Sequence, residues 1–222
     1  MNIRTLARIV TLAGLFVTAA FAADTAKVLF EDKFSARPDA SWRWIRERPE
    51  AWRIADGALM IDTLPGSYWQ MQDSSKNTLL RPAPASAKNG FIVEVLLENE
   101  PKKQYEHAGI ILYFDGLNHV ALNKEFLGKQ SLIIAAAQDG KPTLGPEKEY
   151  REREVWLRLV VRGTKAPGQF RSTEKEPWQT LGELAIPSST KKLLVGIHSG
   201  YGLEKPERHA RIRNFRILQA TE

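Results

Sequence analysis

The chain of 222 residues contains no cysteine. This absence excludes disulfide bonds, thiolate metal sites, a cysteine nucleophile and lipid attachment at an N-terminal cysteine. The sequence also has no N-x-[ST] glycan acceptor, and beyond its first 22 residues it has no apolar run long enough to span a membrane. A hydrophobic core must therefore stabilise the chain without covalent cross-links, which is feasible for a domain of about 200 residues.

The first 22 residues have the pattern of an export signal. Two arginines precede an apolar run over residues 9–21, and the sequence AFA ending at Ala22 is an A-x-A cleavage site. The run is shorter than the about 20 apolar residues of an ordinary membrane helix. We therefore predict a signal peptide over residues 1–22 and one domain over residues 23–222, exported to the periplasm or the extracellular space. The alternative is an uncleaved membrane anchor.

The charge balance gives little reason to expect a nucleic-acid partner. The formal net charge of +6 falls to +4 once the two signal arginines are removed, because that segment contains no acid. The remaining charges lie in mixed runs, which are typical of a solvated surface. The basic cluster over residues 205–216 is interpreted as a salt-bridged strand face, with an acidic-glycan contact as the alternative. We expect no nucleic-acid partner and no membrane contact after cleavage. The sequence does not specify an oligomeric state.

The rest of the sequence predicts an all-β domain. Short runs rich in β-branched and aromatic residues alternate with turn signals such as Asp56-Gly57 and Asp139-Gly140, and no long amphipathic helix pattern occurs. Many short strands at near-regular spacing indicate a sandwich or a barrel. A turn is predicted at residues 166–168. The predicted strands are residues 28–34, 52–55, 58–62, 68–71, 78–81, 90–97, 108–114, 119–125, 130–137, 155–162, 169–172, 180–184, 193–198 and 210–218.

Alternation in one predicted hairpin separates an apolar face from a polar face. Successive strand residues point to opposite sides of a sheet, so Ala108, Ile110 and Leu112 share the core side. If the register across the turn at residues 115–118 is regular, the other side carries a candidate floor for a polar ligand. That predicted face consists of His107, Tyr113, His119, Asn123 and Glu125.

The strand at residues 155–162 has the same alternation. Its polar side carries Trp156 and Arg158, which we expect to add to the ligand face. The alternative is that this pattern describes any half-exposed antiparallel sheet.

Four of the six tryptophans fall between residues 41 and 69. Sugars present flat C–H faces and rings of hydroxyls, so aromatic platforms beside planar donors suit them. We predict Trp44 and Trp69 as stacking platforms in loops, Arg46 as a hydrogen-bond donor and Trp52 as a core residue. The alternative is that several of these tryptophans plug the ends of the sandwich.

These residues resemble a known family. The segments LFEDKF, WRWIRERPEAWRIADGALMIDTLPGSYW, NTLLRPAP and YEHAGIILYFDGLNHVALNKE are similar to the concanavalin A-like domain found at the C-terminus of β-xylosidases and in free-standing bacterial proteins. The resemblance extends over most of residues 28–218. It implies an all-β, antiparallel jelly-roll β-sandwich of two curved sheets whose concave face meets carbohydrate. Its pattern positions are Tyr105, Glu106, Ala108, Gly109 and Tyr113.

The sequence departs from this superfamily at two places. Members often place an aspartate near the last strand in a structural calcium site with acids of the first strand, whereas here Glu31 and Asp32 face a last strand that reads IRNF. We therefore expect no metal and no cofactor, and leave a structural calcium ion open. The hairpin after VWLRL is also altered, with residues 165–168 at its predicted turn.

Three functions remain open. We favour a non-catalytic domain that binds an oligo- or polysaccharide, with Glu106, His107 and Glu125 among its contacts. A glycan-active enzyme that uses these three residues for acid–base chemistry is the second hypothesis. The E-x-D-x-x-E pattern of related glucanases is absent, and no H-x-H or H-E-x-x-H spacing supports a metal enzyme. An exported protein-interaction domain is the third hypothesis. Glu106 itself has two interpretations, as a ligand contact or as a buried carboxylate that accepts hydrogen bonds from loop amides.

Overall fold

A computed structural model describes residues 26–69, 71–85 and 90–220. The predicted signal peptide lies outside this part of the chain. Within the described ranges no helix is long and apolar enough to cross a membrane. Apart from the short 3-10 helix η1 (Pro49–Ala51), the regular structure described there is β-strand, so the all-β prediction is confirmed.

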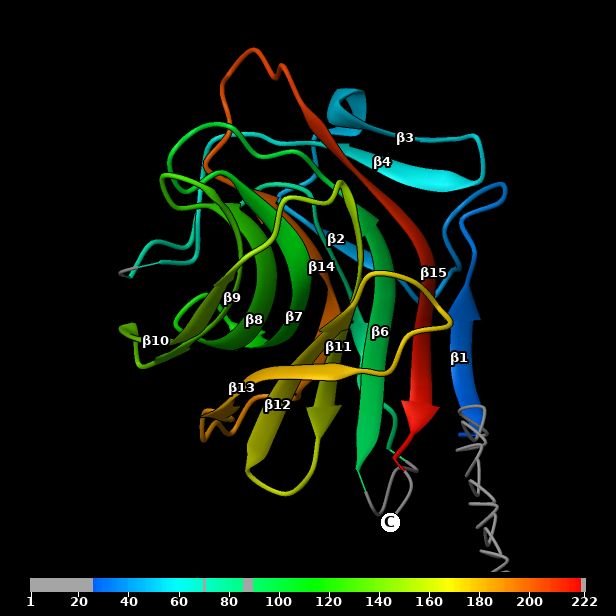
Figure 1. The fold of residues 1–222 in the computed structure, drawn as a ribbon, viewed down its shortest axis with the longest axis vertical. Helices are drawn as coiled ribbons and strands as arrows, with labels where there is room; N and C mark the ends of the chain where they lie inside the picture. The colour runs from blue at the N-terminus through cyan, green and yellow to red at the C-terminus, as the bar shows by residue number, and fades with distance from the viewer. Residues whose placement is uncertain (1–25, 70, 86–89, 221–222) are drawn as a thin grey trace, which may run out of the picture.

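The described strands form two antiparallel sheets that pack face to face (Figure 1), which is the predicted jelly-roll sandwich. The eight-stranded sheet has the order β13 (Gln179–Ala185), β12 (Lys165–Arg171), β11 (Glu154–Val161), β6 (Phe91–Glu98), β15 (His209–Gln219), β4 (Ala58–Asp62) and β3 (Trp52–Ala55), with β1 (Val28–Asp32) paired to β15. The seven-stranded sheet has the order β10 (Lys141–Glu149), β9 (Gln130–Gln138), β8 (Asn118–Phe126), β7 (His107–Asp115), β14 (Leu194–Gly200), β5 (Thr78–Pro82) and β2 (Arg43–Ile45).

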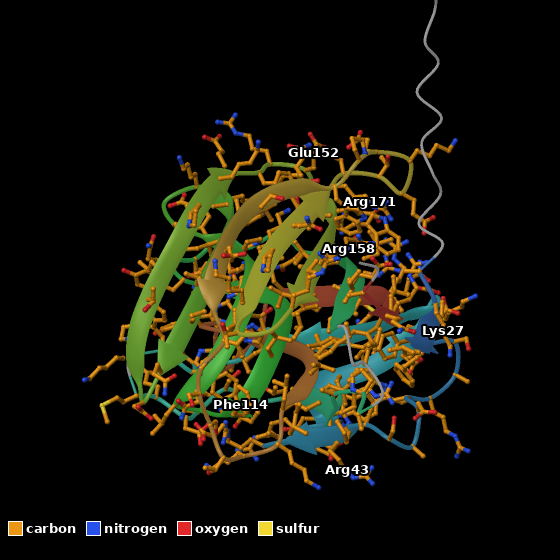
Figure 2. All side chains as sticks on the ribbon, turned by 90° about the horizontal axis from the view of Figure 1, so that it is seen from below. Lys27, Arg43, Phe114, Glu152, Arg158 and Arg171 are labelled. Carbon is orange, nitrogen blue, oxygen red and sulfur yellow. The ribbon has the colours of Figure 1, made fainter. Side chains whose placement is uncertain are left out.

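Alternating apolar side chains of both sheets build the core between them. Ile110 and Leu112 of β7 and Leu157 and Leu159 of β11 are fully buried there. Because the side-chain period of a strand is two, the residues between them must point away from the core. Each sheet therefore has a second, outer face, and the side-chain view in Figure 2 shows polar groups gathered around the two layers.

The predicted hairpin register is confirmed. In the β7–β8 pair, His107 lies opposite Glu125, Gly109 opposite Asn123, and Tyr113 opposite His119. The polar face proposed for this hairpin is therefore the outer face of the seven-stranded sheet.

Several local predictions are wrong. Residues 68 and 69 lie in a bend rather than a strand, and Met71 has a positive φ of 63°. The predicted turn at residues 165–168 lies inside β12. The chain reverses instead at residues 163–164, between the paired Arg162 and Lys165, and Gly163 adopts the positive φ of 57° that this turn needs. Strands β2 and β10 were not predicted, because β2 has only three residues and β10 has the sequence KPTLGPEKE, in which charges and prolines hide the strand pattern.

Candidate functional site

A pocket of about 520 Å³ lies on the outer face of the seven-stranded sheet. Its lining combines tyrosine, tryptophan and histidine rings with two carboxyl groups and a few aliphatic side chains. We name it the aromatic pocket. Its lining residues are Ser67, Tyr68, Trp69, Tyr105, His107, His119, Ala121, Asn123, Glu125, Leu127, Ile133, Ala135, Leu144, Glu147, His198 and Tyr201.

Five of the predicted ligand residues line this pocket. They are His107, His119, Asn123, Glu125 and Trp69. Strands β7 and β8 supply the first four, because their alternation directs these side chains away from the core, and the loop after β4 supplies Trp69. The sequence therefore located the main floor of the pocket.

The remaining rings of the lining are Tyr68, Tyr105, His198 and Tyr201. Tyr68 packs against Tyr113, with 5.4 Å between ring centroids, and the predicted Tyr113 is not itself part of the lining. His198 comes from β14, where alternation with Leu194 and Gly196 could have identified it. Tyr201 follows that strand in a loop, and no sequence signal placed it beside β7.

Tyr105 and Tyr201 form one side of the pocket in an unusual backbone conformation. Their ring centroids are 5.6 Å apart, and Tyr105 is 49% exposed. Both residues have positive φ angles, 67° for Tyr105 and 56° for Tyr201. Large side chains seldom adopt this region, and such strain gathers at functional sites.

A hydrogen bond connects two strands of the pocket floor across a third. His198 Nε2 lies 2.8 Å from Asn123 Oδ1, and Gly109 of β7 lies between them in the sheet. A Cβ atom at position 109 would approach Asn123 Oδ1 to 2.5 Å. Glycine at this position therefore leaves room for the bridge.

Burial keeps the pocket histidines uncharged. Loss of water lowers the pKa of His107 to about 4 and that of His119 to about 4, and it lowers the pKa of His198 well below its ordinary value. His107 Nδ1 donates to the carbonyl oxygen of Tyr105 at 2.9 Å, which leaves Nε2 as an acceptor. At neutral pH the three rings therefore act as neutral donors and acceptors.

Two carboxyl groups occupy the β8–β10 side of the pocket. Burial raises the pKa of Glu125 to about 7, and the negative charge of Glu147 adds to this shift, while a hydrogen bond from Asn123 opposes it. Ser131 Oγ donates to Glu147 Oε1 at 2.6 Å, and Ser131 lies directly opposite Glu125 in the β8–β9 pair. Glu125 and Glu147 belong to strands on either side of β9, so their backbones are two strand spacings, roughly 10 Å, apart, and their side chains project from the same face of the sheet.

Glu106 has a structural role, which corrects its assignment as a ligand or catalytic residue. Its carboxylate is 2% exposed and accepts hydrogen bonds from the backbone N–H groups of Lys102 and Lys103 at 2.8 and 3.1 Å. Arg208 Nε lies 2.8 Å from both of its oxygens. The parity of β7 explains the difference, because Glu106 points to the opposite side of the sheet from His107.

Trp44 and Arg46 are also engaged elsewhere. Trp44 lies in β2 and packs against Trp52 and the core, with 4.8 Å between the two ring systems, so it is not a loop platform. Trp52 is partly buried against the core, as predicted. Arg46 donates to Asp73 Oδ1 at 2.6 Å and to the carbonyl oxygen of Ser75 at 2.8 Å, beside the pocket rather than in its lining.

The expectation that Trp156 and Arg158 share the face of His107 is wrong, because β11 belongs to the eight-stranded sheet. Both residues lie on the outer face of that sheet, where Arg158 Nη2 donates to the buried Glu94 at 2.7 Å. The guanidinium groups of Arg158 and Arg171 lie over the Trp178 ring at 4.0 and 4.3 Å, and Figure 2 shows the two arginines close together. These stacked cations and rings stabilise the outer layer.

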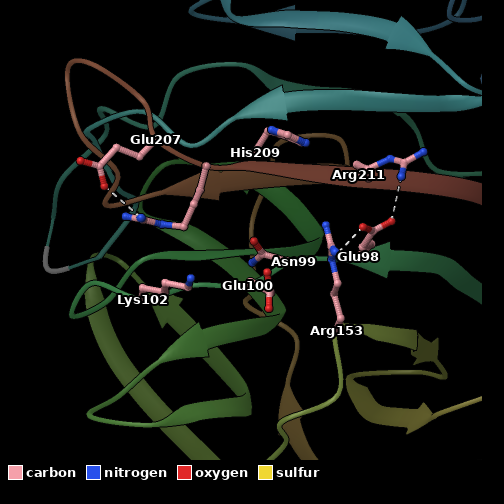
Figure 3. A pocket seen from close by; sticks show the side chains of 9 residues that line it. Glu98, Asn99, Glu100, Lys102, Arg153, Glu207, His209 and Arg211 are labelled. Carbon is pink, nitrogen blue, oxygen red and sulfur yellow. Dashed lines mark hydrogen bonds and ion pairs between the residues drawn. The ribbon is translucent and has the colours of Figure 1, made fainter.

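A smaller pocket of about 250 Å³ has a charged lining where β6 ends and β15 begins (Figure 3). Its charges are mostly paired with one another. Glu98 binds Arg153 at 2.9 Å and Arg211 at 3.2 Å, and Arg208 binds Glu207 at 3.0 Å. These ion pairs confirm the salt-bridged interpretation of the basic cluster near the C-terminus, and they leave little charge for a ligand.

The residues at the proposed calcium position do not fit a metal site. Asp32 accepts hydrogen bonds from the backbone N–H groups of Phe34 and Asp39 at 2.8 and 3.0 Å, and from Trp42 Nε1 at 2.8 Å. Glu31 points to Lys33, 3.6 Å away. Within the described ranges, no three acidic, histidine or cysteine side chains lie close enough to hold a metal ion together.

Two packed antiparallel sheets with a ligand-sized pocket on one outer face define a concanavalin A-like β-sandwich. The model of the β-xylosidase C-terminal concanavalin A-like domain matches residues 31–198, and the chain belongs to this family. Comparison with curated protein sequences found no significant match.

Solved structures share the fold at low sequence identity. The GH43 protein BlXynB from Bacillus licheniformis is 18% identical with a TM-score of 0.77, over 86% of this chain and 39% of its own. A xylan β-1,4-xylosidase from Bacillus halodurans C-125 is 18% identical with a TM-score of 0.70, over 85% and 38%. A functionally unknown protein from Saccharomyces cerevisiae is 16% identical with a TM-score of 0.63, over 82% and 98%. The chain thus spans about two fifths of the length of the two bacterial proteins.

Proposed function

We propose that this protein is an exported, non-catalytic carbohydrate-binding domain whose ligand occupies the aromatic pocket. A role connected with carbohydrates agrees with its family, the concanavalin A-like domain of β-xylosidases, and with a structural neighbour named as a xylan β-1,4-xylosidase. The catalytic activity of that longer protein is not carried over, because this chain covers 38% of it.

The observation that carries the proposal is the composition of the pocket. Tyr105, Tyr201 and Trp69 offer ring faces for the C–H surface of a sugar, while His107 and Asn123 offer polar atoms for its hydroxyl groups. A volume of about 520 Å³ lies within the usual range of ligand pockets, about 300–1,000 Å³.

Calorimetry tests this proposal directly. The domain over residues 23–222 should bind at least one class among xylan, arabinan, pectin and β-glucan oligosaccharides. Trp69→Ala should weaken that binding about fivefold or more, since stacking contributes on the order of 1 kcal/mol or more. Trp178→Ala, on the other sheet, is the matched control and should leave binding unchanged. No binding to any of these oligosaccharides would refute the proposal.

Export has its own test. Expression of the full chain in a bacterial host should yield a periplasmic or secreted protein whose N-terminal sequence begins at Ala23. A product that retains Met1 in the membrane fraction would support the anchor alternative instead.

A glycoside hydrolase is the second candidate, and the Glu125–Ser131–Glu147 arrangement favours it. Glycosidases use two carboxyl groups about 5–10 Å apart, one protonated and one ionised. Glu125 would donate its proton to the glycosidic oxygen as the C1–O bond breaks, and Glu147 would accept a proton from the water that attacks C1. Glu106 has no part in this scheme.

Product release distinguishes the two candidates. An enzyme would release reducing sugar from a bound oligosaccharide, and Glu125→Gln or Glu147→Gln would abolish release while binding persists. Binding without release by the unmodified protein would retain the non-catalytic function. The protein-interaction hypothesis would gain support only if sugar binding were absent and a protein partner required the same pocket residues.

A further inference from the structure

The charged side chains that line the aromatic pocket are acidic. Its described lining contains two carboxyl groups, Glu125 and Glu147, and three histidines, but no lysine and no arginine. The histidines are His107, His119 and His198, and their burial keeps them uncharged at neutral pH. Nothing in the lining can therefore neutralise an acidic ligand.

The cations on the pocket strands point elsewhere. Lys124, next to Glu125, extends to the core side of β8 and donates to the carbonyl oxygen of Glu152. Lys148, next to Glu147, lies over the ring of Phe170, 5.3 Å from its centroid. The alternation of the strands therefore separates each of these lysines from its acidic neighbour.

Lys129 and Arg46 are occupied as well. Lys129 pairs with Glu149 at 3.8 Å, and Arg46 pairs with Asp73 at 2.6 Å. Neither cation belongs to the lining of the pocket.

The pocket floor also has an acceptor that lacks a donor. Nδ1 of His198 is buried without a hydrogen-bond partner among the described residues. Since Asn123 Oδ1 accepts from His198 Nε2, the proton of that ring is on Nε2 and its Nδ1 carries a lone pair. A buried acceptor without a partner destabilises the structure, so an O–H or N–H donor at this floor would be favoured.

From the absence of cations in the described lining and the unpaired acceptor on His198, we propose that the aromatic pocket selects sugar units that carry only hydroxyl or amino donors and excludes uronic acids. This inference rests on the proposed carbohydrate-binding function and specifies its ligand class. A uronate carboxylate would lie near the half-buried Glu125 and the exposed Glu147 with no compensating charge in the lining, and the repulsion between like charges opposes binding. Discrimination thus comes from repulsion as well as from attraction.

Matched oligosaccharides test the selectivity. Calorimetry at pH 8 should compare cellotetraose with its C6-oxidised uronate form, galactotetraose with tetragalacturonate, and xylotetraose with its glucuronic-acid-substituted form. In each pair in which either member binds, the neutral member should bind at least tenfold more tightly. A uronate that binds as tightly as its neutral counterpart would overturn the inference and leave the proposed function standing. If no member of any pair binds, both fail.

Variants of the two glutamates test whether their charges cause the discrimination against acidic sugars. In Glu125→Gln/Glu147→Gln the discrimination between neutral and acidic members should shrink toward equality, and each single variant should shrink it in part. The control Glu50→Gln/Glu183→Gln changes the net charge equally at exposed positions outside the pocket and should retain the full discrimination. Circular dichroism verifies that each variant is folded. Full discrimination in both single variants and in the double variant would contradict the inference.

Discussion

His198 Nε2 and Asn123 Oδ1 are 2.8 Å apart although two strand spacings separate their backbones, because the intervening residue, Gly109, has no side chain. A Cβ atom at Gly109 would lie 2.5 Å from Asn123 Oδ1 and 2.1 Å from the carbonyl oxygen of Leu122. The hydrogen bond across the floor of the aromatic pocket thus requires glycine, which has no Cβ atom, at position 109.

Gly109→Ala should lower the free energy of unfolding by about 2–4 kcal/mol, because it overpacks the sheet and leaves two polar groups unpaired. Urea denaturation followed by tryptophan fluorescence measures this change. Gly128→Ala is the control, since a Cβ atom there meets nothing within 4 Å, and it should cost no more than about 2 kcal/mol for its φ of 76°. Equal stability of Gly109→Ala and the unmodified protein would contradict this account.

The stability of the protein should fall as Glu125 ionises. Its folded pKa of about 7 lies above its ordinary value of 4.5, so the protonated form favours folding. That contribution is fully present below pH 4.5 and is lost as the pH rises through about 7. Relative to Glu125→Gln, the unmodified protein should lose as much as about 2 kcal/mol across this interval. Parallel pH profiles of the two proteins would refute the raised pKa.

The buried histidines should act in the opposite direction. His107 and His119 have folded pKa values of about 4, below their ordinary value of 6.5, so their contribution is present above pH 6.5 and is lost as the pH falls through about 4. His119→Gln should remove on the order of 3 kcal/mol of this acid sensitivity. Chemical denaturation between pH 4 and pH 7 measures it. His209→Gln is the comparison outside the aromatic pocket: burial lowers the pKa of this half-buried histidine as well, so its profile should change in the same direction but by less.

Glu106→Gln should destabilise the fold by about 2–4 kcal/mol, because it leaves Arg208 without its buried partner. The exposed neighbour provides the control, and Glu207→Gln should change stability by less than about 0.5 kcal/mol. Sugar binding by a folded fraction of Glu106→Gln should be unchanged. Loss of binding or turnover with full stability would instead restore Glu106 as a functional residue.

Two tryptophans that look alike in the sequence should respond differently. Trp44→Ala should cost about 2–3 kcal/mol of stability through the lost contact with Trp52, with no direct effect on ligand affinity. Trp69→Ala should change stability by less than about 1 kcal/mol and affect binding instead. Melting curves combined with calorimetry of both variants make the comparison. A loss of binding in Trp44→Ala together with a loss of stability in Trp69→Ala would refute the placement of the two rings.

The features predicted well depend on local alternation. The shared outward orientation of four side chains could be predicted because strand side chains alternate with a period of two and the two strands are joined by a short turn. These side chains are His107, His119, Asn123 and Glu125. The same alternation places Glu106 on the opposite side of the sheet from His107. A single hairpin carries this information within its own sequence.

The features missed depend on long-range pairing. Trp156 shows the same alternation as His107, yet the sequence does not state which sheet its strand joins. His198 and Tyr201 reach the pocket because β14 pairs with β7, about 90 residues earlier in the chain. Local patterns therefore specify faces, whereas sheet membership requires the whole fold.

Strand β10 forms one edge of the seven-stranded sheet, and its exposed residues include Lys141, Pro142, Pro146 and Lys148. An open edge offers unpaired backbone groups to other chains, and lysine and proline discourage such pairing. We therefore expect the same residues that hid this strand in the sequence to keep its edge from pairing with the sheet of another copy, and so to limit aggregation at high concentration.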